Sequence, residues 1–242
     1  AVIGLPAAVP RDMSTDGSNI YLTYAGLSSG FGLWKIDDTQ TASNVAYGQE
    51  FHSVDFVKGY VMVSGDSTTG PANDLYYSPS GNVSVNDYDH PLSSWVWTSF
   101  ASGQNAIYAA GHSGDKGAIY KITIASTGVL DTPVVALEFP IGEIPYTVYG
   151  YLGNMFIGTS KGVRYATSDN ESNLVSGSLI PTPSSVTSFT ADDKYVWFNW
   201  SNYDGVSTGL GRIDLTSFTS TNTPSFAADL MHTSGSSVLH VA

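Results

Sequence analysis

The sequence has no cysteine and few charged residues, and each shortage excludes a class of function. Without cysteine there is no thiolate nucleophile, no cysteine-ligated zinc and no disulfide. Lys and Arg together number only 9 among 242 residues, against 21 Asp and Glu, which gives a net charge of -12. Binding a nucleic acid needs clustered basic side chains that release counterions. We therefore expect no nucleic-acid partner.

Long hydrophobic runs are also missing. No apolar stretch approaches the 18 or more residues of a membrane-spanning helix, and no charged segment followed by an apolar core marks a signal peptide. We therefore expect no membrane insertion. The sequence begins with Ala1 and not with Met, and we treat residues 1–242 as a single domain that is either a whole protein or a fragment of a longer chain.

What the chain does contain is an apolar and hydroxyl-rich composition. Apolar residues make up 42% and aromatic residues 12% of the sequence, and 55 residues are Ser or Thr. A chain of this length and composition can bury a substantial core. The surface must be hydrated mainly by hydroxyls, amides and backbone groups. The composition therefore indicates one globular, acidic domain.

A two-part unit recurs five times along the chain. Its first part is a short stretch of alternating aromatic and β-branched residues, and its second is a short stretch, usually led by a small residue, that often carries aromatic, basic and Ile residues in succession. The first parts begin near residues 20, 60, 107, 155 and 195. Period-two alternation with Gly, Asn, Asp and Ser at the joints predicts β-hairpins. The predicted hairpins lie near residues 19–37, 59–78, 105–122, 153–166 and 193–215.

The spacing of these units predicts a β-propeller. Steps of 40 to 48 residues match four antiparallel strands per blade. Short segments such as 51–56 and 185–189 precede the hairpins and are interpreted as innermost strands. Residues 237–241 have the same character without a following hairpin, so we predict five blades and a partial sixth. Either residues 1–10 complete the last blade or the natural chain continues. A β-sandwich or β-solenoid would not repeat at this step.

Two motifs that look catalytic have simpler interpretations. Residues 158–162 fit the G-x-S-x-G nucleophile pattern around Ser160, but a strand follows where that motif needs a helix. Residues 113–120 resemble the Asp-box turn of sialidase-like propellers, which implies a structural turn made by Ser113, Asp115 and Gly117. A sialidase also needs three converging arginines.

The chain has three arginines in all, Arg11, Arg164 and Arg212. Arg164 and Arg212 occupy a repeat position that holds Lys35 and Lys121 in other copies. We interpret that position as a scaffold feature, with the aliphatic stem over a neighbour and the charge in water.

Metal sites and catalytic carboxylates have weak sequence support. The histidines, at positions 52, 90, 112, 232 and 240, never pair at i, i+2 or i, i+4, so we expect no catalytic metal and no cofactor. Loops at Asp66-Ser67 and Asp204-Gly205 could hold calcium, but they lack EF-hand spacing and suit Asx turns. A carboxylate pair for glycoside hydrolysis stays open as an alternative, because spacing along a propeller says little about distance across it.

The aromatic clusters supply the candidate ligand-binding residues. Trp95 and Trp97 share one strand face, which favours a packed interface over a binding platform. Trp197 and Trp200 must point to opposite faces of a regular strand, so one of them leaves the core. We select Trp200 with Tyr203 and Asp204 as the surface site best suited to stack on a sugar, and Trp95 with Trp97 as further candidates.

Residues 195–215, YVWFNWSNYDGVSTGLGRIDL, resemble a stretch of the minor tail proteins of bacteriophages that infect actinobacteria. The similarity extends over about residues 155–231, with Gly162-Val163-Arg164 and residues 177–180 upstream. The resemblance implies a structural, non-catalytic component of a phage tail tip, located in the extracellular virion and contributing to host-surface attachment. It implies other tail proteins and a host glycan or protein as partners. It implies no catalytic residues, and no tube-attachment or trimerisation segment is visible.

Two other functions remain as alternatives to this expectation. One is a glycan-binding, lectin-like propeller, although the unequal loop lengths disfavour a symmetric lectin. The other is a propeller glycosidase or lyase, which would need carboxylates or a histidine converging at the central channel. The net charge of -12 favours a neutral glycan or a protein over anionic wall polymers as the bound surface.

Overall fold

The fold was analysed in a computed structural model of the chain, in which almost all regular structure is β-strand. The structure describes residues 4–24, 31–46, 50–66, 74–79, 86–87, 92, 94–103, 105–167, 175–176, 179–201, 208–217 and 230–234. Within these residues there is one short 3-10 helix, Leu215–Ser217, and no α-helix. In the same part of the chain, no helix is long and apolar enough to cross a bilayer.

The strands form five antiparallel sheets, which we number 1 to 5 in chain order. Sheets 1, 2, 3 and 5 have four strands each, and sheet 4 has a fifth short strand, β17, paired with β15. The strands of sheets 1 and 2 are β1 (Asp12–Thr15), β2 (Ile20–Tyr24), β3 (Gly32–Ile36), β4 (Ala42–Ala46), β5 (Glu50–Val57), β6 (Tyr60–Asp66), β7 (Asp74–Pro79) and β8 (Asn86–Asp87). Those of sheet 3 are β9 (Val96–Ser102), β10 (Ala106–Ser113), β11 (Lys116–Thr123) and β12 (Val134–Glu138). Those of sheets 4 and 5 are β13 (Pro145–Tyr151), β14 (Asn154–Thr159), β15 (Gly162–Thr167), β16 (Val175–Ser176), β17 (Ile180–Pro181), β18 (Ser185–Ala191), β19 (Tyr195–Ser201), β20 (Thr208–Asp214) and β21 (Leu230–Ser234).

All five predicted hairpins are confirmed. They correspond to the pairs β2–β3, β6–β7, β10–β11, β14–β15 and β19–β20, each antiparallel and in continuous register. Each hairpin supplies the two middle strands of its sheet, because a strand precedes it and another follows it in the order of the sheet. The repeat seen in the sequence is therefore the central hairpin of a four-stranded blade.

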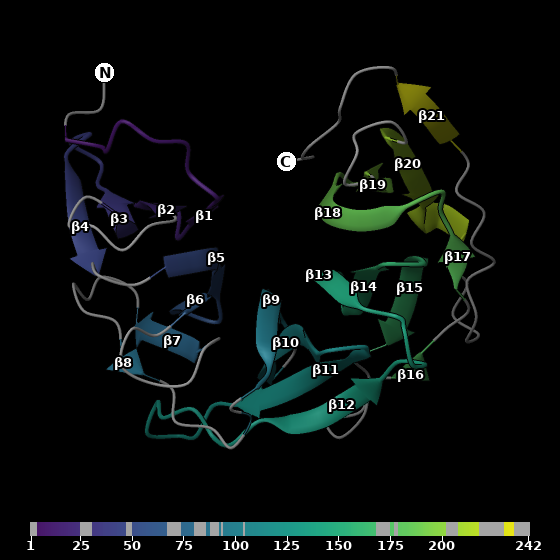
Figure 1. Ribbon diagram of the computed structural model, residues 1–242, viewed down its shortest axis with the longest axis horizontal. Coiled ribbons are helices and arrows are strands. Elements are labelled where there is room, and N and C mark those ends of the chain that lie inside the picture. The colour runs from purple at the N-terminus through teal and green to yellow at the C-terminus, as the bar shows by residue number, and fades with distance from the viewer. Residues whose placement is uncertain are drawn as a thin grey trace.

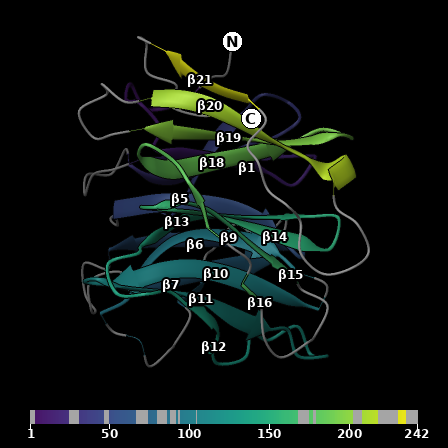
Figure 2. The ribbon, with the colours of Figure 1, turned by 90° about the vertical axis from the view of Figure 1, so that its right-hand side faces the viewer.

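The five sheets are arranged around a common centre as in a β-propeller (Figure 1). The first strand of each sheet packs against the first strand of the next, in the series β1, β5, β9, β13 and β18. The segments 51–56 and 185–189, predicted to be innermost strands, lie in β5 and β18. Seen from the side, the strands of the successive sheets run roughly across the view (Figure 2). This arrangement places five inner strands around one central region.

The core lies between neighbouring sheets, and strand alternation explains how it forms. In β10, Ile107 and Ala109 pack toward sheet 2, while Tyr108 and Ala110 pack toward sheet 4. Successive side chains of a strand point to opposite faces. A sheet whose two faces are both apolar can therefore pack against the sheet before it and the sheet after it. Buried clusters of this kind join sheets 1 and 2, 2 and 3, 3 and 4, and 4 and 5. Each large side chain buried in them contributes about 1.5–3 kcal/mol.

The outer face of sheet 1 is covered by the N-terminal segment. Leu5 and Ala8 pack against Leu22, Tyr24 and Ile36 on that face. The described part of the segment, residues 4–10, forms no strand and lies on sheet 1. Whether residues 1–10 complete a last blade or the natural chain continues therefore stays open. Residues 237–241, which carried the prediction of a partial sixth blade, lie outside the described residues.

Candidate functional site

Residues on or beside the five inner strands line a pocket of about 420 Å³ in the central region between the sheets. We call it the central pocket. Each inner strand contributes side chains to its wall, and most of them are polar. The lining residues are Arg11, Asp12, Met13, His52, Ser53, Asp55, Thr98, Ser99, Tyr146, Thr147, Val148, Tyr149, Thr187, Ser188 and Phe189. A concave site with several convergent polar groups is the default place to look for ligand binding.

Two aspartates of the central pocket bond the backbone of the next sheet. Oδ2 of Asp12 accepts a hydrogen bond from the backbone N–H of Val54 at 2.9 Å. Oδ2 of Asp55 accepts one from the backbone N–H of Phe100 at 2.8 Å. Asp12 therefore fastens β1 to β5, and Asp55 fastens β5 to β9. The two carboxylates thus fasten three of the five inner strands in series.

The two carboxylates also influence each other. Burial is the main cause that raises the pKa of Asp55 well above its usual value, and the negative charge of Asp12 raises it further. Hydrogen bonds from Phe100 and Ser99 act in the opposite direction but are weaker causes. A buried carboxyl next to a second carboxylate favours its neutral form. Asp55 is thus held protonated over a wider pH range than an ordinary aspartate.

Hydroxyl groups continue the same series of contacts between sheets. Oγ of Ser14 accepts a hydrogen bond from the backbone N–H of Phe56 at 2.8 Å. Oγ of Ser99 accepts one from the backbone N–H of Val148 at 3.2 Å, which joins β9 to β13. These short polar side chains replace the ladder hydrogen bonds that separate sheets cannot form with each other.

A positive group lies at one side of the central pocket. Nη2 of Arg11 donates to Oε1 of Glu50 at 2.7 Å, and Nη1 of Arg11 contacts Nδ1 of His52. The side chains of Arg11 and Glu50 are 40% and 31% exposed, so the ion pair is solvent-accessible. Exposed pairs contribute little to stability, which leaves Arg11 available to donate to a ligand.

Aromatic side chains also line the central pocket. The rings of Tyr149 and Phe189 are stacked, with centroids 6.2 Å apart and planes 22° apart. Burial raises the pKa of Tyr149 above its usual value. Tyr146 is 38% exposed and presents its ring and hydroxyl at the pocket. The wall therefore combines rings with hydroxyl and carboxyl oxygens, a composition suited to a polyhydroxylated ligand.

The tryptophans selected from the sequence are buried. Trp200, Trp97 and Trp95 are only 1%, 2% and 8% exposed. The expectation of an exposed Trp200 is wrong, because its face of β19 packs against sheet 4 together with Val196 and Phe198. Tyr203 and Asp204, its predicted companions, lie outside the described residues.

Trp197 lies on the other face of β19, as strand alternation requires, and it is more exposed. Its Nε1 donates to Oδ2 of Asp192 at 3.0 Å. The guanidinium of Arg212 lies 4.1 Å from the ring centroid of Tyr195 and 5.6 Å from that of Trp197. Of Trp197 and Trp200, the one that points out of the core is therefore Trp197. The guanidinium of Arg212 lies over its ring and over the ring of Tyr195.

The predicted Asp-box residues lie at a tight hairpin turn without the bonding of that motif. Ser113 pairs with Lys116 across the β10–β11 turn. No side-chain hydrogen bond of Asp115 is found within the described residues, and Gly114, not Gly117, has the positive φ of 59°. A Cβ on Gly117 would lie 2.4 Å from Cδ of Pro145. That glycine is required by close packing and not by the turn.

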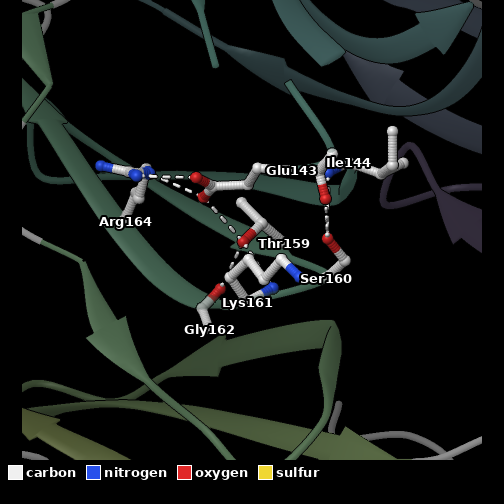
Figure 3. A network of polar contacts seen from close by, with 8 residues as sticks. Glu143, Ile144, Thr159, Ser160, Lys161, Gly162 and Arg164 are labelled. Carbon is white, nitrogen blue, oxygen red and sulfur yellow. Dashed lines mark hydrogen bonds and ion pairs between the residues drawn. The ribbon is translucent and has the colours of Figure 1, made fainter. Parts of the chain in front are cut away.

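The G-x-S-x-G match is a hairpin turn, as predicted (Figure 3). Thr159 pairs with Gly162, so Ser160 and Lys161 form the turn between β14 and β15. Oγ of Ser160 accepts from the backbone N–H of Ile144 at 3.1 Å. No histidine or other base is among the partners of Ser160 in the described structure. The serine fastens a loop and has no activating group.

The three arginines do not converge, which disfavours the sialidase interpretation. Arg11 lies at the central pocket, and Arg212 lies over the rings of the fifth sheet. Arg164 makes a two-pronged ion pair with Glu143, with Nε to Oε1 and Nη2 to Oε2 both 2.6 Å (Figure 3). The expectation that the charge of Arg164 lies in water is therefore wrong, since its side chain is only 15% exposed.

Metal ligation has no support in the described part of the chain, where no group of three or more His, Asp or Glu side chains could hold an ion. His52 contacts Arg11, and Nδ1 of His112 lies 3.2 Å from the carbonyl oxygen of Gly114. The loop positions considered for calcium, Ser67, Asp204 and Gly205, and the side chain of Asp66, lie outside the described residues.

Sequence reasoning missed the residues of the central pocket. Asp12, Asp55 and Ser99 stand about 45 residues apart and come together only when the inner strands converge. A signal does exist. Polar side chains recur at alternate positions in the segments before each hairpin, for example Asp12 and Ser14, or Ser53 and Asp55. Inner strands otherwise carry apolar residues, so this alternation could have marked the central wall.

Comparisons with known proteins support the fold. No family model and no curated protein matches the chain. Among solved structures, it is similar to a putative 6-phosphogluconolactonase from Bacteroides uniformis, with a TM-score of 0.63, 12% identity, and coverage of 96% of this chain and 72% of that one. It is also similar to a catalytically inactive virginiamycin B lyase from Staphylococcus aureus, crystallised with quinupristin, with a TM-score of 0.60 and 14% identity over 90% of this chain and 71% of that one.

A third similar structure is a prolyl endopeptidase, with a TM-score of 0.51 and 10% identity. The match covers 84% of this chain and 32% of the endopeptidase, so this chain spans about a third of that protein. At such identities the likeness concerns the fold alone. It supports the all-β, propeller-like architecture. Function must be argued from the site itself.

Proposed function

We propose that this chain is a non-catalytic binding propeller that holds a neutral, hydroxyl-rich ligand in its central pocket. The observation that supports the proposal is the hydrogen bonding of Asp12 and Asp55. Each accepts a hydrogen bond from the backbone of the adjacent sheet. A general acid or base must exchange its proton with a substrate, whereas these carboxylates are bonded to backbone groups that keep the ring assembled.

The lining of the pocket defines the class of ligand. Glu50 offsets the charge of Arg11, and Asp12 adds a further negative charge. Together with the net charge of -12, this arrangement repels anionic polymers. Hydroxyls of a sugar can donate to the Ser, Thr and Asp oxygens and accept from Arg11, while Tyr146 provides an exposed ring. Neutral glycans therefore fit the pocket best.

We further propose a phage tail tip as the setting, with other tail proteins as neighbours and a host surface as the source of the glycan. The similarity of residues 195–215 to minor tail proteins supports this setting. The chemistry of the chain is compatible with an extracellular particle, because the fold needs no disulfide and carries few charges. Antibody labelling of virions from the source phage tests the setting independently of ligand binding.

A glycan array, followed by calorimetry on the best neutral hit, tests the binding function. We expect binding to neutral glycans and none to strongly anionic polymers. Tyr146→Ala should weaken binding about three- to tenfold, because it removes one exposed ring from the pocket. Tyr195→Ala, at a half-buried ring outside the pocket, should leave binding unchanged. Binding confined to anionic polymers, or equal loss in both variants, would contradict the proposal.

A propeller glycosidase is the second candidate, and one observation favours it. Asp55, whose pKa is raised, lies close enough to Asp12 to feel its charge, and a protonated carboxyl beside a carboxylate is the pair that glycoside hydrolysis uses. Release of reducing sugar from a bound neutral glycan tests it. Turnover that Asp55→Asn abolishes while binding persists would establish catalysis and overturn the non-catalytic proposal.

A further inference from the structure

A second pocket lies in sheet 3, outside the central pocket. Its volume is about 350 Å³, and we call it the rim pocket. The side chains around it are three aromatic rings, one Ile, one Lys and one Glu. They are Trp95, Tyr120, Phe139, Ile141, Lys116 and Glu138. None of them belongs to the central pocket, so the rim pocket needs a separate explanation.

The floor of the rim pocket is aromatic. The rings of Trp95 and Tyr120 meet edge to face, with centroids 5.0 Å apart. Trp95, Tyr120 and Phe139 are each less than a tenth exposed. Their exposed edges offer an apolar surface to a branched or aromatic side chain, and we call the space above them the slot. The floor therefore suits an apolar group.

The indole of Trp95 gives independent evidence that the slot is more than a part of the hydrophobic core. Nε1 of Trp95 is buried and has no hydrogen-bond partner in the described structure. The indole lies over Gly111, where a Cβ would approach Nε1 to 2.2 Å. Buried donors are nearly always satisfied in proteins, and exceptions need an explanation such as a functional site.

Two opposite charges flank the slot without pairing with each other. Ala118 pairs with Glu138 across β11 and β12, and Lys116 lies two residues before Ala118. Lys116 and Glu138 are therefore diagonal neighbours on one face of the sheet, a separation at which long side chains can still meet. No ion pair of either residue is found among the described residues. Glu138 lies near Tyr120, whose pKa it helps to raise after burial, the larger cause.

The wall of the rim pocket is firmly held. It is formed by the segment between β12 and β13, whose Ile141 is 77% exposed. Glu143 of that segment is bound by Arg164, and Ser160 bonds Ile144 (Figure 3). The backbone N–H of Gly142 also donates to the carbonyl of Asp115 at 2.8 Å. A wall held in place before binding reduces the ordering cost that a ligand must overcome.

We propose that the rim pocket binds a free apolar α-amino acid, such as leucine or phenylalanine, as its zwitterion. Glu138 receives the ammonium group, Lys116 receives the carboxylate, and the side chain packs in the slot against Trp95, Tyr120 and Phe139. The charges on the protein and on the ligand are complementary, and among the described residues neither charged residue has an ion-pair partner that would have to be displaced. The inference does not depend on the proposed function of the central pocket.

Titration of the ¹⁵N-labelled protein with L-leucine and L-phenylalanine tests the proposal. We expect shifts in the Trp95 indole signal, which Trp95→Phe identifies among five tryptophans, and a dissociation constant on the order of 1 mM. N-acetyl-L-phenylalanine and L-phenylalaninamide, which each lack one charge, should bind at least about tenfold more weakly. Equal binding of these derivatives, or no shift with either amino acid, would overturn the proposal.

Two variants and one matched control locate the site. Lys116→Met and Glu138→Gln should each weaken binding at least about tenfold while leaving the melting temperature unchanged. Lys121→Met changes a lysine on the opposite face of the same strand, so it should bind like the wild type. Binding that survives both site variants, or that falls equally in the Lys121 control, would place the ligand elsewhere and refute the assignment.

Discussion

Breaking the ion pair between Arg164 and Glu143 by removing one partner should be among the most destabilising single substitutions in this weakly charged chain. The side chains are 15% and 4% exposed, and two hydrogen bonds of 2.6 Å join them. Replacing Arg164 with Met leaves the Glu143 carboxylate buried with Oγ1 of Thr159, 2.9 Å away, as its remaining donor. Breaking a buried pair in this way typically costs about 3–5 kcal/mol.

We expect the lower end of that range for Arg164→Met. Thr159 continues to stabilise the carboxylate, and Arg164 is not completely buried. A loss of about 3 kcal/mol should lower the melting temperature of a domain of this size by roughly 6–12 °C. Urea unfolding followed by tryptophan fluorescence gives the free energy directly. Lys121→Met is the control, because it removes a lysine from the corresponding strand of sheet 3 for which no ion pair is found among the described residues, and it should change stability by no more than about 0.5 kcal/mol.

The double variant Glu143→Leu/Arg164→Met separates the charge from the packing. If desolvation of an unpaired carboxylate causes the loss, removing both charges should restore much of the stability. A loss below about 1 kcal/mol for Arg164→Met relative to the control would refute the argument that the pair is desolvated. The argument would also be refuted if the double variant lost more free energy of unfolding than Glu143→Leu and Arg164→Met lose together.

Two further predictions concern the inner strands and the tryptophan slot. Since burial, followed by the charge of Asp12, raises the pKa of Asp55, the folded state holds this proton more tightly than the unfolded state. Stability from this group is complete below the unfolded pKa and is lost as the pH rises through the folded pKa, with a slope of at most about 1.4 kcal/mol per pH unit. The amide oxygen of Asp55→Asn can still accept the hydrogen bond from the backbone N–H of Phe100. The variant should therefore lose this pH dependence and be more stable than the wild type at alkaline pH. Parallel pH profiles of the two proteins in urea unfolding would disprove that Asp55 causes the pH dependence. Gly111→Ala should cost about 1–3 kcal/mol by overpacking, because the new Cβ would lie 2.2 Å from Nε1 of Trp95; thermal melts that match the wild type would contradict this.

The blades could be predicted from the sequence because hairpins are local. In the hairpin of residues 195–214, period-two alternation predicts the strands, and the register pairs Tyr195 with Asp214 and Ser201 with Thr208. Both strands and their turn lie within about 20 residues, so neighbouring sequence contains the whole pattern. The same reasoning succeeded at Ser160, where a strand after the motif excluded a nucleophile elbow.

The burial of Trp200 could have been predicted, and its misinterpretation has a definite physical cause. Val196, Phe198 and Trp200 share one face of β19, and that face is almost wholly apolar. The opposite face carries Trp197 and Asn199. A sheet buries its more apolar face, so Trp200 belonged in the core. The sugar site was inferred from Tyr203 and Asp204, which follow the strand. The apolar pattern of the strand itself was not taken into account.

The central pocket was beyond local reasoning for a different reason. Asp12 and Asp55 each bond a residue more than 40 positions away, and which strands become neighbours depends on the order of whole sheets. The sequence shows polar residues at alternate positions but cannot show that they line one pocket. Long-range pairing of this kind becomes visible only once the inner strands have converged.

The structure of the central pocket determines which residues can test its function. Asp12, Asp55 and Ser99 line the pocket and also fasten one inner strand to the next. A substitution that removes the hydrogen-bond acceptor at these positions, such as alanine, therefore weakens the fold and the site together, and loss of binding in such a variant would not distinguish the two. Tyr146 lines the same pocket and is 38% exposed, and no side-chain hydrogen bond from it to another strand is found among the described residues. It is the residue at which a change in ligand binding reports on recognition alone.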